Sequence, residues 1–121
     1  MAEKLLVVDD DRITRRTIRS FLNEEGYEVV LTEDGAAALE NFCRDEFDLV
    51  VTDFVMSGMD GLTLTQEIHA IDPKTPVVMM SGHHAIDKAN AVRGGADDFI
   101  QKPILLDELL DKIKNLLNAR T

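Results

Sequence analysis

The sequence predicts an α/β fold in which five strands of a parallel sheet alternate with five helices. The first observation is a set of five short, apolar and β-branched runs, nearly continuous as in parallel strands covered on both faces. The second is that stretches of about 10 to 15 residues with helical spacing separate these runs. The third is their strict alternation, which favours right-handed crossovers and one doubly wound sheet.

Each strand and helix can be placed along the chain in order. The expected strands are Leu5–Val8, Val29–Thr32, Leu49–Thr52, Val77–Met80 and Phe99–Gln101. The first expected helix, Arg12–Glu25, has an apolar face and an opposite face of four arginines. Its two faces consist of Ile13, Thr14, Thr17, Ile18, Phe21 and Leu22, and of Arg12, Arg15, Arg16 and Arg19. The later helices are expected after Asp34-Gly35, after the N-cap Asp60, over Ala85–Arg93, and along the leucines from Leu106 to Leu117.

Length and charge exclude several classes of protein. A chain of 121 residues predicts one domain, over residues 1–121, with one core. Thirteen basic and 23 acidic residues give a formal net charge of −10, which disfavours direct binding to nucleic acid or an anionic membrane. No apolar run reaches the roughly 20 residues that cross a bilayer. Because Cys43 is the only cysteine and no secretory leader is evident, we expect a cytoplasmic protein, with Cys43 buried or half-buried on a helix.

Polar residues follow four of the five strands. Asp9-Asp10-Asp11, Asp53, Ser81-Gly82 and Lys102-Pro103 come directly after the first, third, fourth and fifth strands. Each of these alone is most simply a helix cap or a solvated turn residue. Together they are expected at one edge of the sheet, outside the carboxyl ends of the strands, where open parallel sheets bind ligands.

The chemistry of these groups is complementary. Three neighbouring carboxylates, Asp9, Asp10 and Asp53, would repel one another strongly without a cation. Mg²⁺ prefers such oxygen ligands and would relieve that repulsion. The hydroxyl of Ser81 and the ammonium of Lys102 suit phosphoryl oxygens. The pattern therefore predicts a magnesium-dependent phosphate site.

With these residues in place, the chain resembles the receiver domain of two-component response regulators over nearly its whole length. The segments that carry the resemblance are Leu5–Asp11, Asp48–Met56 through Gly58-Met59-Asp60-Gly61, Val77–Gly82, and Gly95–Pro103. Any one motif is weak, whereas the ordered set with its spacing is specific. The resemblance implies a flavodoxin-like sheet in the order 2-1-3-4-5, which puts both carboxylate-bearing strands at the point where the winding direction reverses.

The resemblance also implies a role for each site residue. Asp53 is the expected phosphoacceptor, and Asp10 the direct ligand of Mg²⁺, with Asp9 acting mostly through water. Asp53 and the backbone carbonyl of Val55 complete the expected metal ligands. The phosphoryl oxygens are expected to bind Ser81 and Lys102, with Ser81 and Phe99 forming the switch and a cis Lys102-Pro103 bond beside them.

These roles imply a signalling protein that assists its own phosphorylation and dephosphorylation rather than an enzyme. The expected phosphoryl donor is a phosphohistidine on a sensor histidine kinase or phosphotransfer protein, and the expected target is a downstream effector or fused output domain. Phosphorylation is expected to repack the face of the fourth helix, fifth strand and fifth helix. A phosphorylation-dependent homodimer stays open, since no particular residue supports it. The four arginines form either a solvated face or a docking surface for the kinase.

Two other functions compete with this interpretation. A phosphatase with an aspartyl-phosphate intermediate needs a second acid two residues after the nucleophile, where this chain has Val55. A degenerate receiver that only binds partners predicts a missing site residue, and none is missing. Ser57 stands where many relatives have proline, Val55 and His83 flank the site, and His69 is expected on the surface.

Overall fold

Five parallel strands form one sheet in the order β2-β1-β3-β4-β5 in the computed structural model, which describes residues 2–82 and 85–119. The strands are β1 (Lys4–Val8), β2 (Glu28–Thr32), β3 (Leu49–Asp53), β4 (Val77–Ser81) and β5 (Asp98–Gln101). The helices are α1 (Arg12–Glu24), α2 (Gly35–Arg44), α3 (Gly61–Ile71), α4 (Lys88–Arg93) and α5 (Leu106–Ala119). The predicted fold class and strand order are confirmed.

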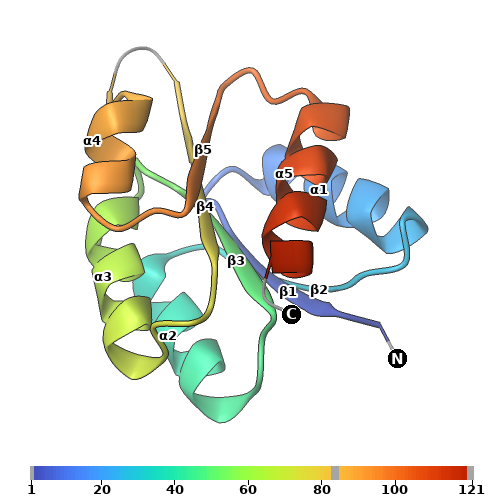
Figure 1. Cartoon of the computed structure of the whole chain (residues 1–121), viewed down its shortest axis with the longest axis horizontal. Helices are drawn as coiled ribbons and strands as arrows, with labels where there is room; N and C mark the ends of the chain where they lie inside the picture. Colours follow the sequence, from blue (N-terminus) through green and yellow to red (C-terminus); the bar gives the residue numbers. More distant parts are fainter. Residues whose placement is uncertain (1, 83–84, 120–121) are drawn as a thin grey trace.

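Helices cover both faces of the sheet (Figure 1). α1 and α5 lie on one face, and α2, α3 and α4 lie on the other. Alternate residues of each strand point to opposite faces. In β1, Leu5 packs with the α1 and α5 layer, whereas its neighbour Leu6 packs with α2 and α3. Burial on both faces explains why the strands are continuous apolar runs without a polar alternation.

At their carboxyl ends, two strands extend one residue further than the sequence predicts. Asp53 is the last residue of β3, paired with Met80, and Ser81 is the last residue of β4, paired with Gln101. Both backbones are therefore fixed by the sheet rather than by a loop. Because the hydrogen bonds between strands hold these backbones, the side chains of Asp53 and Ser81 project from fixed positions. A functional site needs such fixed geometry.

The start of α3 is pressed against the end of β3. Gly61 is the first residue of the helix, and a Cβ atom built there would lie only 2.2 Å from the carbonyl oxygen of Asp53. The Gly61 amide also donates to the carbonyl of Phe54 at 2.8 Å. Only glycine fits this close approach. The start of α3 therefore holds the backbone of Asp53 and Phe54 in place.

Two helix expectations are wrong in detail. α4 begins at Lys88 rather than Ala85, because the Asp87 carboxylate caps it by accepting a hydrogen bond from the Asn90 amide at 2.8 Å. In α1, Ile13 lies in the expected apolar stripe but is 75% exposed, because it lines an open groove instead of packing into the core. No helix within residues 2–82 and 85–119 is long and apolar enough to cross a membrane.

Cys43 also differs from expectation, because its side chain is exposed. The buried stripe of α2 consists of Gly35, Ala38 and Phe42. Cys43 follows Phe42 by one residue, which turns it about 100° away from that stripe. Its thiol faces solvent and contributes nothing to the core.

Candidate functional site

Three carboxylates converge at the carboxyl end of the sheet. β1 and β3 are paired neighbours, so Asp9 and Asp10, which follow β1, come beside Asp53 at the end of β3. One oxygen from each lies within 4.8 Å of the others. Asp9 is fully buried and Asp53 nearly so, whereas Asp10 is exposed. The predicted acidic cluster is therefore assembled, with one open side.

Lys102 reaches into this cluster from the end of β5. Its ammonium lies 3.2 Å from Asp9 Oδ2 and 3.0 Å from Asp53 Oδ2. Its backbone amide donates to the Ser81 carbonyl at 2.7 Å, and the Lys102-Pro103 peptide bond is cis, as the resemblance implies. A single cation thus bridges two buried carboxylates that come from different strands.

The charges in this cluster are not balanced. Burial raises the pKa of Asp53; the hydrogen bond from Lys102 opposes that effect, and the charge of Asp9 adds to it. Burial alone would lower the pKa of Lys102, but its hydrogen bond to Asp53 and the charges of both aspartates raise it instead. Lys102 therefore stays a cation, but its charge does not fully compensate the burial of ionised Asp53.

The donor set fits a hard divalent cation. All three side chains of the cluster offer carboxylate oxygens, the ligands that Mg²⁺ prefers, and the exposed Asp10 leaves room for the waters that it retains. Val55 lies two residues beyond Asp53, in the loop toward α3, with a side chain that is 59% exposed. An added cation would also supply the positive charge that Asp53 lacks.

Ser81 and Phe99 lie next to this cluster rather than within it. Ser81 is almost fully buried, and its hydroxyl faces the Gly82 carbonyl at 3.5 Å. Phe99 is half-buried and packs against Met79 and Ala91. Both line a cavity of about 600 Å³ between α4, β5 and α5. The two predicted switch residues therefore face a common space.

Arg15 is a site residue that the helical pattern of the sequence places wrongly. Its guanidinium Nη1 donates to the backbone carbonyl of Asp9 at 2.6 Å, and the side chain is half-buried. Angles around the helix put it with the solvated arginines. A long side chain in the second turn of α1 can nevertheless fold back over the loop before the helix, which a helical projection does not represent.

The structure tests the expected place of His69 but not that of His83. His69 was expected on the surface, but it is half-buried, with Nε2 3.0 Å from the Thr75 carbonyl and 3.3 Å from Asp97 Oδ2. It joins the end of α3 to the segments that enter β4 and β5. His83 lies outside the described residues.

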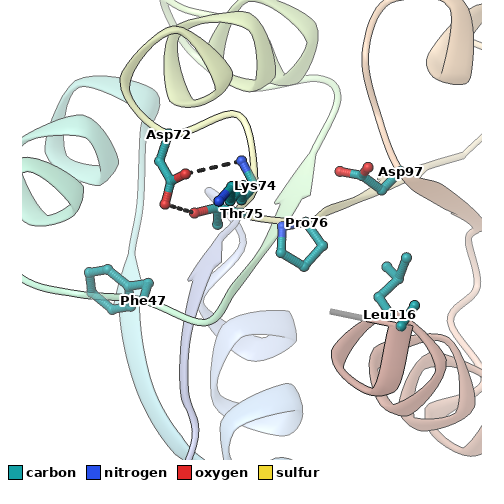
Figure 2. Close-up of a pocket in the computed structure, with 8 residues that line it drawn as sticks. Phe47, Asp72, Lys74, Thr75, Pro76, Asp97 and Leu116 are labelled. Carbon is teal, nitrogen blue, oxygen red and sulfur yellow. Dashed lines mark hydrogen bonds between the residues drawn. The ribbon is translucent and has the colours of Figure 1, made fainter. Parts of the chain in front are cut away.

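A second cavity, of about 650 Å³, lies at the opposite end of the sheet (Figure 2). Phe47, Pro76 and Asp97, which precede β3, β4 and β5, contribute to its walls. Asp72 accepts hydrogen bonds from the Lys74 amide at 3.0 Å and the Thr75 hydroxyl at 2.9 Å. The cavity is separated from Asp53 by the length of the strands, so it is not part of the acidic site.

Known proteins are similar to this chain in both sequence and fold. The family model for the response regulator receiver domain matches residues 5–114. The response regulator MprA of Mycolicibacterium vanbaalenii is 34% identical over all of this chain and 53% of its own length. MprA of Mycobacterium leprae is 36% identical over 94% of this chain and 50% of its own length, so the chain spans about half of these relatives.

Solved structures agree with these sequence matches. The CheY-like receiver domain protein of Methanospirillum hungatei superposes with a TM-score of 0.93 at 28% identity, covering 99% of this chain and 97% of that one. NtrX of Brucella abortus gives a TM-score of 0.92 at 37% identity, covering 99% of this chain and 28% of the other. With the strand order and the acidic site described above, these matches show that the chain belongs to the response regulator receiver family of two-component signalling.

Proposed function

We propose that this chain accepts a phosphoryl group on Asp53 from the phosphohistidine of a sensor histidine kinase or phosphotransfer protein, in a reaction that requires Mg²⁺. The observation that supports it best is the meeting of Asp53 with Asp9, Asp10 and Lys102 at one edge of the sheet. Ionised Asp53 is a nucleophile whose approach to a phosphate depends on neighbouring positive charge.

In the proposed transfer, a carboxylate oxygen of Asp53 forms a bond to phosphorus. The phosphorus–nitrogen bond to the donor imidazole breaks, and its electron pair stays on that nitrogen. Bound Mg²⁺ supplies charge neutralisation for the phosphoryl oxygens during this exchange. Asp10, Asp53 and the Val55 carbonyl would hold the ion directly, and Asp9 mostly through water. Lys102 would hold a phosphoryl oxygen, for which its raised pKa keeps it charged.

Ser81 and Phe99 would carry the change to the output face. The Ser81 hydroxyl would turn toward the new phosphoryl group, and Phe99 would move into the space that Ser81 leaves. The shared cavity between α4, β5 and α5 supports this role, because it gives both side chains room to repack. The affected face would control a downstream effector or a fused output domain, and a phosphorylation-dependent homodimer is a further way to use it.

The donor would dock beside α1. Ile13 and Leu105 are 75% and 66% exposed, and a groove of about 290 Å³ joins Ile13 to Lys102 and Pro103. Arg12 and Arg16 are exposed on the same helix. An apolar groove that Lys102 lines, on a helix that also carries these exposed arginines, fits a helical partner with an acidic surface, next to the residue that receives the phosphoryl group.

The chain would act, over residues 1–121, as a phosphoacceptor that assists its own reactions, and not as a phosphatase. A phosphatase with an aspartyl intermediate needs an acid where this chain has Val55. We place it in the cytoplasm, where a lone exposed cysteine stays reduced.

Incubation with acetyl phosphate tests this function without a partner. Intact-mass spectrometry of the wild type should show a gain of one phosphoryl group that requires Mg²⁺. Asp53→Ala should show none under the same conditions. Magnesium binding without any phosphoryl gain would instead indicate a receiver that only binds partners.

A further inference from the structure

Arg15 makes a contact that no part of the proposed transfer uses. Its Nη1 donates to the carbonyl oxygen of Asp9 at 2.6 Å, across the loop that joins β1 to α1. Arg12, Arg16 and Arg19 of the same helix are exposed, whereas Arg15 is half-buried. A charged donor on a backbone carbonyl is a stronger hydrogen bond than a neutral one. The contact therefore restrains the loop between β1 and α1.

The peptide group restrained by Arg15 leads directly into Asp10. The Asp9 amide donates to the Thr32 carbonyl at 3.2 Å, and the Asp11 amide donates to Asp9 Oδ1 at 2.8 Å. In the described part of the chain, no hydrogen bond or ion pair holds the exposed Asp10 carboxylate itself. The backbone therefore decides from where the Asp10 side chain projects, and the Arg15 contact restrains the peptide plane between Asp9 and Asp10 that sets this starting point.

Charge alone would make Arg15 unfavourable for binding a cation. Its guanidinium contacts the Asp9 carbonyl and adds positive charge near the site, so its removal would tighten Mg²⁺ binding if proximity were its only effect. Removal would weaken binding if its hydrogen bond positions a ligand. The two roles thus predict opposite signs.

We propose that Arg15 is a positioning residue for the magnesium site: by holding the Asp9 carbonyl, it keeps the Asp10 carboxylate directed toward the metal. This inference rests on the proposed function, because it concerns the same ion. Removing a group that orients a metal ligand typically costs about tenfold or more in metal affinity. The benefit of orientation exceeds the electrostatic cost of one additional cation.

The test compares Arg15→Met with Arg16→Met. The second variant removes the same charge from the next residue, whose side chain is exposed. Methionine keeps the aliphatic stem of Arg15 and removes its donor. Mg²⁺ dissociation constants are measured by following amide chemical shifts in a titration of each full chain at constant ionic strength. The spectra also show whether each variant is folded, and a loss of stability alone does not change the affinity of the folded form.

We expect Arg15→Met to weaken Mg²⁺ binding about tenfold. Arg16→Met should bind as tightly as the wild type or slightly more tightly, as loss of a distant cation predicts. Equal affinities in the two variants, or tighter binding by Arg15→Met, would overturn the positioning role while leaving the proposed function intact. A wild type that binds no Mg²⁺ would overturn both.

Discussion

Lys102→Met removes the only cation that touches both buried aspartates, among the contacts of the described residues. At an effective dielectric constant of about 20, each of its ion pairs, at 3.2 and 3.0 Å, has a Coulomb energy of about 5 kcal/mol. The loss of hydration by the ammonium and both carboxylates offsets much of this energy. Breaking one side of a buried pair usually costs about 3–5 kcal/mol. We expect about 3 kcal/mol here, because Asp10 leaves the site open to water.

The pH dependence gives this loss a signature. Burial already raises the pKa of Asp53, and loss of Lys102 should raise it further. A carboxyl with a raised pKa binds more protons in the folded state than in the unfolded state, so the folded protein gains stability as the pH falls. The deficit of Lys102→Met should thus be greatest at neutral pH and shrink as the pH falls toward the ordinary carboxyl range near about 4.

Urea unfolding followed by circular dichroism, without magnesium and over this pH range, measures both effects. Lys112→Met is the matched control, because Lys112 has a similarly shielded ion pair with Asp98 at 3.3 Å but faces only one carboxylate. It should cost about 1 kcal/mol or less. A Lys102→Met protein within about 0.5 kcal/mol of the wild type at neutral pH would refute the view that Lys102 neutralises these aspartates, since that margin is the size of an ordinary surface substitution.

Three further predictions concern phosphorylation and its consequences. Phe99→Ala should remove the dependence of effector binding on phosphorylation, because the side chain that fills the space beside Ser81 is gone; binding that stays fully dependent would exclude the switch role. Arg12→Glu with Arg16→Glu, both exposed, should slow transfer from the kinase in a phosphotransfer time course while leaving the rate with acetyl phosphate unchanged, and equal slowing of both would contradict a docking role. Val55→Asn should shorten the lifetime of the phosphoryl group, since an amide can orient the attacking water where the 59% exposed valine cannot; an unchanged rate of phosphate release would count against this.

Much of the framework could be predicted because it depends on local pattern. Strands buried on both faces must be apolar without interruption, so runs such as Leu49–Thr52 are visible in the sequence. The convergence of Asp9, Asp10 and Asp53 follows from a parallel sheet, in which all carboxyl ends lie at one edge. The strand order came from the family resemblance, since alternation alone does not fix which strands are neighbours.

The remaining features depend on tertiary contacts. Arg15 was assigned by helical angle and His69 was expected on the surface, but each side chain reaches a backbone carbonyl of another segment. The start of α4 was placed too early because Ala85 favours a helix, whereas capping by Asp87 decides where the helix begins. Ile13 belongs to the apolar stripe by angle, yet it lines an open groove and is 75% exposed.

Locating the phosphoryl group on the chain tests whether Asp53 is the residue that accepts it. After reaction with acetyl phosphate and Mg²⁺, borohydride reduction converts an aspartyl phosphate to homoserine, which tandem mass spectrometry of peptides can assign to one position. We expect homoserine in place of Asp53 and unmodified aspartate at Asp9, Asp10 and Asp11. Homoserine at one of those neighbours, or at no position in a protein that has gained a phosphoryl group, would contradict the assignment of Asp53 as the phosphoacceptor.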